Sequence, residues 1–123
     1  MFEIAVDAGR KLIRATMWGF MTVEEVYDFS RQEQTAIKRM GCGSGEFLLL
    51  IETHGATTQS QDVVAAFQDI IVNSPLKAKK IASVRAGSLS RIQTRRMMMV
   101  RENIAVFETV EEAEVWLLAP PEG

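Results

Sequence analysis

The feature that most constrains the fold is a run of five apolar residues, Phe47–Ile51, in the stretch EFLLLIE. A strand with one face in water alternates apolar and polar residues, whereas this run is apolar on both faces. Such strands are typical of the middle of a largely parallel sheet that helices cover on both sides. The run therefore predicts the central strand of an α/β fold.

Turn and cap signals divide the rest of the chain into strands and helices. The turn sequence Asp7–Arg10 favours a hairpin between the first two strands. Thr22 with Glu25 has the spacing of a capping box, Gly41 is a typical helix stop, and Ser60 is the expected cap of the next helix. The expected strands are 2–6, 11–18, 46–52, 79–86 and 104–108, and the expected helices are 23–40, 61–73, 88–100 and 110–118.

This order, β-β-α-β-α-β-α-β-α, implies a single α/β domain with an N-terminal hairpin, a mostly parallel sheet and right-handed crossovers. The chain has 123 residues, which is enough for one domain with a sizeable core and too few for two. We assign residues 1–119 to the domain and residues 120–123 to a short C-terminal tail.

Composition and charge exclude several classes of protein. No apolar run is long enough to span a bilayer, and the N-terminal segment lacks the pattern of a signal peptide. Cys42 is the only cysteine, which excludes an internal disulfide, so a cytoplasmic location is expected. Segment 76–101 has eight basic and no acidic side chains, and it either steers an anionic partner or is neutralised by neighbouring acidic helices. Nucleic-acid binding is not expected, because the chain is acidic overall and no aromatic residues interrupt the basic segment.

Two local sequences resemble those of a known fold family. WGFMTVEEV, residues 18–26, is similar to the strand–Gly–Thr–Glu entry into the first long helix of SpoIIAA-like proteins. IAVFETVEEAEVWL, residues 104–117, is similar to the closing strand and helix of stand-alone bacterial members, with Trp116 as an aromatic anchor. The order of elements also resembles this fold, which STAS domains share with the lipid-binding lobe of Sec14-type proteins. The resemblance implies a SpoIIAA-like domain, but it identifies a fold and not an activity.

The turn that follows the central strand, in the stretch THGATTQSQ, carries hydroxyl groups on Thr57, Thr58 and Ser60. In the STAS proteins that antagonise anti-sigma factors, which this chain resembles in fold, the corresponding turn carries an Asp-Ser phosphorylation motif. This turn has no Asp-Ser pair. A phosphate would be tolerated at a helix N-terminus, but Ser and Thr are also ordinary helix caps. We therefore interpret these hydroxyl groups as caps and do not expect a phosphoswitch.

No group of residues in the sequence has the pattern of a catalytic centre. His54, the only histidine, follows the central strand, where open α/β sheets place ligand sites. It would share a strand face with Glu52 only if the strand continued that far, and a histidine base also needs a nucleophile. Cys42 follows a helix C-terminus, where the helix dipole disfavours a thiolate. We interpret His54 as an exposed loop residue and Cys42 as an incidental loop cysteine, and we expect no catalytic residue, metal or other cofactor.

A second polar turn, in the stretch AGSLSR, follows a strand and opens a helix. If its strand lies next to the central strand, the two turns converge and their backbone N–H groups form a small site that accepts an anion. Two capped helices are the alternative interpretation. The predicted ligand-binding residues are Thr57, Thr58, Ser60, Ser88, Ser90 and Arg91.

The helix expected after this turn contains three adjacent methionines, which cannot all share one helix face. Arg95 and Met98 are expected to lean outward and to form part of an interaction surface, because methionine suits adaptable apolar contacts.

These observations support three functions in order of preference. The first is a non-enzymatic STAS-like interaction module that acts through contacts with an unidentified protein partner and forms a homodimer. The second is a Sec14-like binder of a lipid or another amphipathic anion, with a pocket walled by Met97–Met99 and entered past Arg91 or Arg95. The third and least favoured is a small hydrolase that uses His54.

Overall fold

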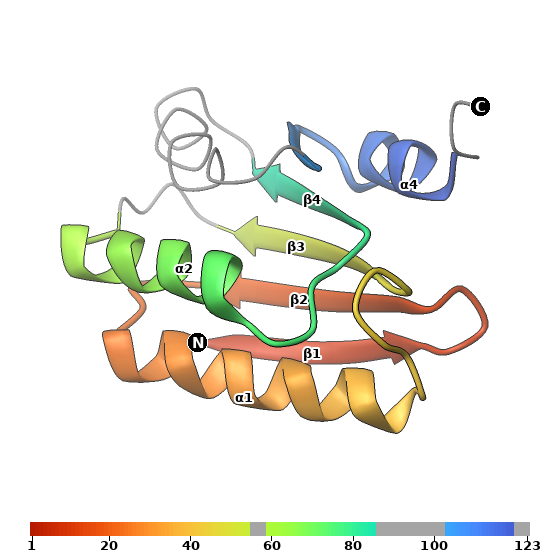
Figure 1. Cartoon of the computed structure of the whole chain (residues 1–123). Coiled ribbons are helices and arrows are strands. Elements are labelled where there is room, and N and C mark those ends of the chain that lie inside the picture. Colours follow the sequence, from red (N-terminus) through yellow and green to blue (C-terminus); the bar gives the residue numbers. More distant parts are fainter. Residues whose placement is uncertain (55–58, 86–102, 120–123) are drawn as a thin grey trace.

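The computed structural model describes residues 1–54, 59–85 and 103–119, which form a sheet with helices on both faces (Figure 1). Helices α1 and α2 cover one face, and α4 covers part of the other. The strands are β1 (Phe2–Asp7), β2 (Leu12–Trp18), β3 (Leu48–His54), β4 (Lys80–Arg85) and β5 (Ile104–Phe107), and the helices are α1 (Val23–Arg39), α2 (Gln61–Asn73) and α4 (Val110–Leu118). The predicted α/β class is therefore confirmed.

The five strands lie in the order β1-β2-β3-β4-β5. β1 and β2 form the expected antiparallel hairpin, and every other neighbouring pair is parallel. In this register Leu49 lies between Ile13 of β2 and Ile81 of β4. β3 is thus the middle strand of the sheet, and β1 is an edge strand that pairs with β2 alone within the described residues.

Both faces of β3 are buried, as the run of five apolar residues predicts. Leu49 and Ile51 belong to the core cluster between the sheet and the α1–α2 layer, and their side chains are 5% and 6% exposed. Leu50 belongs to the second core cluster, which also contains Ala113 and Leu117 of α4. The middle strand therefore joins two separate layers of apolar packing.

Local sequence signals account for the helix ends. Thr22 and Glu25 form a complete capping box at the start of α1, because each side chain accepts a hydrogen bond from the other residue's backbone N–H. Ser60 and Thr109 cap α2 and α4 in the same way as Thr22, although no reciprocal bond closes a box there. After α1, Gly41 has a φ of 74°, which side chains with a Cβ rarely adopt.

The inner face of α1 includes a charged residue. Val23 at the start of the helix is 37% exposed, whereas Phe29 and Glu33 are buried. The buried stripe consists of Val26, Phe29, Glu33 and Ile37, at intervals of three or four residues. The spacing of apolar residues in the sequence does not identify Glu33 as buried, because charged residues are rarely found in a protein core.

The expected bounds of the central strand need correction. β3 ends at His54 and not at residue 52, because its ladder with β2 continues to the pair Trp18–His54. Cys42 lies in the loop after α1, as expected, and it is buried with only 7% exposed. The expected helix 88–100 and the tail 120–123 lie outside the described residues. Among the helices that the structure describes, none has both the length and the apolar content needed to cross a membrane.

The burial of β3 predicts a large effect of a charge in this strand. Leu49→Asp should lower the free energy of unfolding by several kcal/mol, because an unpaired carboxylate would lie between β3 and the α1–α2 layer. Val115→Asp is the matched control, since Val115 is 74% exposed on α4, and it should change the stability by less than about 0.5 kcal/mol. Chemical denaturation measures both values. Equal stability of Leu49→Asp and the wild type would show that β3 is not a core strand.

Candidate functional site

The carboxyl ends of β3 and β4 lie side by side, as the predicted anion site requires. These two strands are parallel neighbours, and Thr53 near the end of β3 pairs with Arg85 at the end of β4. The chain therefore leaves the sheet at neighbouring points on its way into the two predicted turns. Of the predicted ligand-binding residues, only Ser60 is described, and the others, Thr57, Thr58, Ser88, Ser90 and Arg91, lie outside the described residues, as do Arg95 and Met98 of the predicted interaction surface.

Ser60 acts as the cap that the sequence predicts. Its Oγ accepts a hydrogen bond of 3.3 Å from the backbone N–H of Val63, and its backbone is extended, as is usual for an N-cap residue. The hydroxyl oxygen is thus engaged at the start of α2. This geometry accounts for Ser60 without a phosphate.

His54 and Glu52 contact each other on one face of β3. His54 is the last residue of the strand and not a loop residue, and its Nε2 lies 3.2 Å from Glu52 Oε1. Because β3 continues to residue 54, His54 and Glu52 share a strand face and form a histidine–carboxylate pair, although the His54 side chain is 57% exposed. Within the described part of the chain, no hydroxyl or thiol is hydrogen-bonded to His54. The described residues also contain no cluster of three His, Cys, Asp or Glu side chains that could hold a metal ion.

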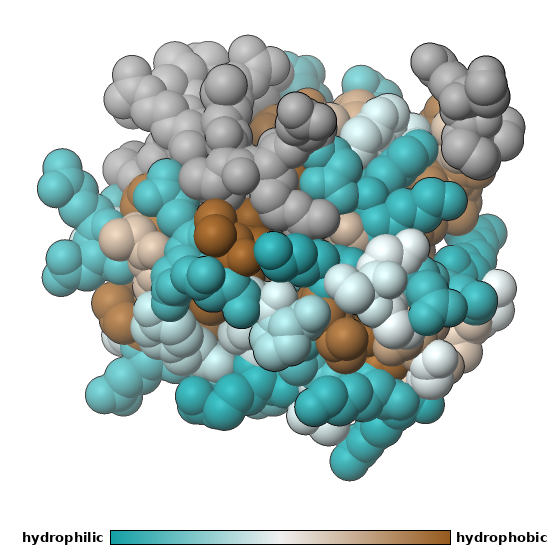
Figure 2. Space-filling model, viewed as in Figure 1, coloured by the Kyte–Doolittle hydropathy of each residue, from teal (hydrophilic) through white to brown (hydrophobic). Residues whose placement is uncertain are grey.

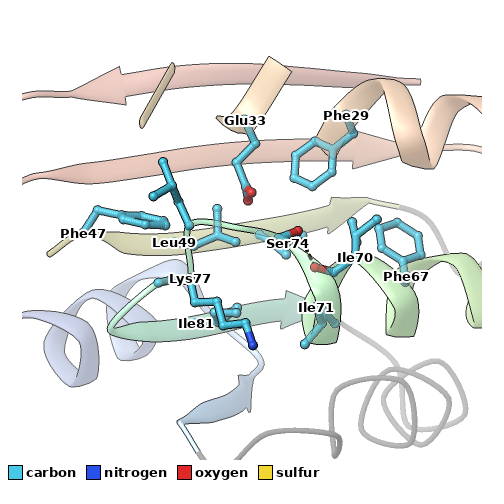
Figure 3. Close-up of a pocket in the computed structure, with 13 residues that line it drawn as sticks. Phe29, Glu33, Phe47, Leu49, Phe67, Ile70, Ile71, Ser74, Lys77 and Ile81 are labelled. Atoms are coloured by element: carbon cyan, nitrogen blue, oxygen red, sulfur yellow. Dashed lines mark hydrogen bonds between the residues drawn. The ribbon is translucent and has the colours of Figure 1, made fainter. Parts of the chain in front are cut away.

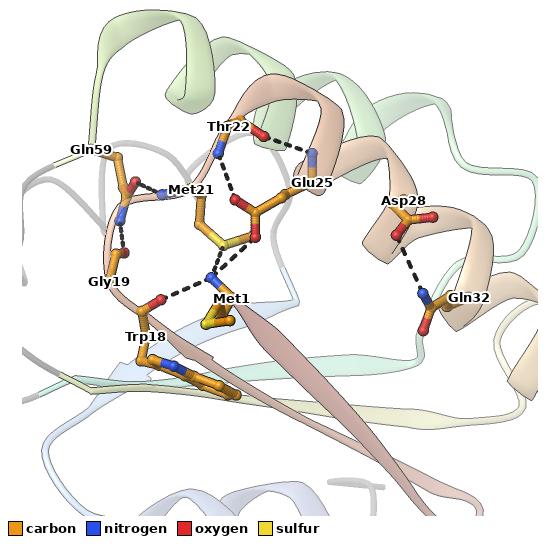
Figure 4. Close-up of polar contacts among 9 residues, drawn as sticks. All are labelled: Met1, Trp18, Gly19, Met21, Thr22, Glu25, Asp28, Gln32 and Gln59. Atoms are coloured by element: carbon orange, nitrogen blue, oxygen red, sulfur yellow. Dashed lines mark hydrogen bonds and ion pairs between the residues drawn. The ribbon is translucent and has the colours of Figure 1, made fainter.

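A buried glutamine, Gln59, fixes the entry to α1 against the entry to α2 (Figure 4). Its Oε1 accepts a hydrogen bond of 2.9 Å from the backbone N–H of Met21, and its Nε2 donates to the backbone oxygen of Gly19 at 3.1 Å. Gly19 has a φ of 74°, so the chain turns sharply here between β2 and α1. Gln59 was not predicted, because its partners are about forty residues away in the sequence.

A small apolar pocket lies between α1, α2 and the sheet, and the carboxyl group of Glu33 points into it (Figure 3). The pocket has a volume of about 30 Å³, enough for one or two groups of the size of a water molecule and too small for a lipid chain. Glu33 is only 7% exposed. We call this site the Glu33 pocket; it is lined by Phe29, Glu33, Phe47, Leu49, Ile51, Phe67, Ile70, Ile71, Ser74, Leu76, Lys77, Ala78 and Ile81.

The Glu33 carboxyl group has few polar partners. The Gln34 side-chain amide donates a hydrogen bond of 3.2 Å to Glu33 Oε1, and the same amide nitrogen also donates to the backbone oxygen of Leu76 at 3.0 Å. No Lys or Arg among the described residues forms an ion pair with Glu33. Burial in this apolar environment therefore raises the pKa of Glu33 to about 7, and the hydrogen bond from Gln34 opposes part of that rise.

A second hollow lies on the opposite side of α1, beside the edge strand β1. This groove has a volume of about 590 Å³ and runs between Ile4 and Val6 of β1, with Ala8 of the following turn, and the second half of α1. Arg31 and Arg39 are the charged residues that line it. Where Figure 2 shows described residues, this face of the molecule is mainly hydrophilic with small, separate hydrophobic areas.

Charges are separated along the outer stripe of α1. Glu24, Asp28, Arg31, Thr35 and Arg39 follow one another at intervals of three or four residues and therefore lie on one side of the helix. The stripe is acidic at its start and basic at its end. Asp28 pairs with Arg31 at 3.3 Å, whereas neither end of the stripe, Glu24 or Arg39, has an ion-pair partner among the described residues.

Comparisons with known proteins leave the family open. No model of a known protein family matches the chain, and no curated protein matches it. The Glu33 pocket, the groove beside β1 and the sheet edges are the features from which a function can be inferred.

The Glu33 pocket predicts how stability depends on pH. The folded state holds the Glu33 proton up to about pH 7, whereas the unfolded chain releases it near the ordinary value of 4.5. Stability is therefore lost as the pH rises between these two values. Relative to the wild type, Glu33→Gln should gain about 3 kcal/mol of unfolding free energy between pH 4 and pH 8. Denaturation series at several pH values measure the difference.

Glu111→Gln is the matched control, because Glu111 is an exposed carboxylate on α4, away from the proposed dimer contacts. Its stability difference from the wild type should change far less between pH 4 and pH 8 than that of Glu33→Gln. An equally small change for Glu33→Gln would show that Glu33 does not hold its proton in the folded state.

Proposed function

We propose that this chain is a non-enzymatic SpoIIAA-like interaction module that forms a homodimer through the edge strand β1 and helix α1. The observation that carries the proposal is the open edge of β1 beside a helix whose charges are separated along its length. The resemblance of the sequence to SpoIIAA-like proteins supports the same class of function.

The edge of β1 is suited to pairing with another strand. β1 has six residues and pairs only with β2 within the described sheet, so its other edge presents unpaired backbone N–H and C=O groups. It carries the apolar residues Phe2, Ile4 and Val6 on the side of the sheet that faces α1, whereas its charged residues, Glu3 and Asp7, alternate with them on the opposite face. Two copies related by a two-fold axis would join these edges in antiparallel orientation and form one continuous sheet.

Such a pairing also brings the two α1 helices together. α1 lies along β1 and β2, next to the edge of the sheet (Figure 1). Neighbouring strands are about 4.8 Å apart, so two helices that each lie over β1 and β2 would be separated by about 10 Å. This is the usual distance between packed helices. The groove between β1 and α1 would then lie inside the interface.

The charges of α1 match this arrangement. α1 runs parallel to β1, since both run antiparallel to β2, so antiparallel β1 strands imply antiparallel α1 helices. The acidic start of one helix, at Glu24, would then lie near the basic end of the other, at Arg39. The two-fold axis repeats this contact, so each dimer gains two pairs of opposite charges. Parallel helices would instead place like charges together, which favours the antiparallel dimer.

A charge exchange tests the dimer. Arg39→Glu and Glu24→Lys should each weaken self-association about tenfold, because each variant replaces two attractive contacts with two repulsive ones. An equimolar mixture of the two variants should recover the wild-type affinity, because the heterodimer restores opposite charges at both contacts. Sedimentation velocity over a range of protein concentrations measures each dissociation constant.

Glu111→Lys is the control, because it reverses an exposed acidic residue in the first turn of α4, far from β1 in the sheet order. It should leave the dissociation constant unchanged. A wild-type protein that stays monomeric, or a mixture that does not recover affinity, would overturn the proposed dimer.

A further inference from the structure

We propose that the Glu33 pocket binds a small primary amine, whose ammonium group pairs with the Glu33 carboxylate while its apolar part lies against Ile71 and Leu76. This inference does not depend on the proposed dimer, because Glu33 lies on the inner face of α1 and the dimer would use the outer stripe.

The first argument is the unmet hydrogen-bonding capacity of Glu33. A carboxylate has about four acceptor positions. In the described structure Glu33 receives one hydrogen bond, from one N–H of the Gln34 amide, while the other N–H of that amide donates to the backbone oxygen of Leu76. A primary ammonium group has three N–H donors and a positive charge, and it would supply both of the features that the site lacks.

The second argument is the chemistry of the walls. The phenylalanines Phe29, Phe47 and Phe67 line the pocket around the carboxyl group. The faces of aromatic rings attract cations, and a carboxylate among aromatic rings is a setting that favours an organic cation over a neutral group. An anion would meet repulsion from the Glu33 carboxylate, so the site discriminates by charge.

The third argument is size and access. The volume of about 30 Å³ fits an ammonium group, which is close to a water molecule in size. The side chains of Ile70, Ile71, Leu76 and Lys77 line the pocket and are only partly buried, so this is the side on which it opens. A short alkyl chain that leaves the pocket here would lie on apolar side chains.

Glu33 is the ionisable group whose charge should control binding, because few other charged or titratable groups lie around it in the described structure. Lys77, on the segment between α2 and β4, is the only other ionisable residue that lines the described pocket, and its side chain extends away from the Glu33 carboxyl group (Figure 3). The residue that follows α2 contributes the Ser74 hydroxyl, which donates to the backbone oxygen of Ile70, and the sheet contributes only apolar residues. Binding should therefore follow the ionisation of Glu33, whose pKa burial raises to about 7.

Titration of the whole protein with propylamine tests the proposal, with NMR of the backbone amides and of the Glu33 carboxyl carbon as the readout. At pH 8 we expect saturable shifts of the Glu33 carboxyl carbon and of amides that line the pocket. Affinity should be at least tenfold weaker at pH 5.5, because Glu33 is then protonated while the amine stays cationic. Saturating propylamine should also lower the pKa of Glu33 toward its ordinary value.

Three controls make the test decisive. 1-Propanol, a neutral molecule of the same length, should give no saturable shifts. Glu33→Gln should weaken amine binding at pH 8 at least tenfold and remove its pH dependence, whereas Arg39→Glu should bind the amine as the wild type does. Lys77→Met should bind at least as tightly, because it removes a like charge near the opening.

Equal binding of 1-propanol, or unchanged affinity in Glu33→Gln, would overturn the proposal. Absence of saturation at pH 8 would also overturn it and would leave the pocket as a site for water. If Glu33→Gln fails to fold, the pH dependence of the wild type alone decides between these results.

Discussion

The burial of β3 on both faces is the constraint on which the rest of this structure depends. Leu49 and Ile51 pack under α1 and α2, while Leu50 packs under α4. Loss of either helical layer would therefore expose apolar side chains of this strand to water. Its parallel ladders to β2 and β4 then fix where the chain leaves the sheet on both sides. The parallel β2–β3 and β3–β4 connections place α1 and α2 on the same face, which leaves α1 next to the edge strand β1.

Periodicity and capping predicted the elements of this fold well, because those signals are local. The run Phe47–Ile51, the capping box at Thr22 and the cap at Ser60 each depend on residues within one or two turns of each other. The same signals could not predict Gln59, whose partners are remote, or the strand continuation to His54, which depends on the ladder with β2. The burial of Glu33 could have been predicted from its regular position in the buried stripe of α1, but only if a charged residue had been allowed at a core position.

α1 thus presents two different surfaces to two different kinds of partner in our account. Its inner face carries Glu33 into an apolar pocket and is held against α2 by a hydrogen bond of 2.7 Å from the Tyr27 hydroxyl to Asp69. This bond lowers the pKa of Asp69 and raises that of Tyr27. Its outer face carries the charges that we assign to dimerisation. A ligand at Glu33 and a second copy at β1 would therefore act on opposite sides of one helix.

Hydrogen exchange of the β1 amides tests the central claim most directly, because it reports on the strand edge itself. Amides of residues 2–7 that point toward β2 should be protected at all protein concentrations. The alternate amides, which point away from β2, should exchange rapidly in dilute protein and become protected as the concentration rises through the dimer dissociation constant. Rapid exchange of these outward amides at concentrations where the protein is dimeric would contradict the account and would place the dimer interface elsewhere.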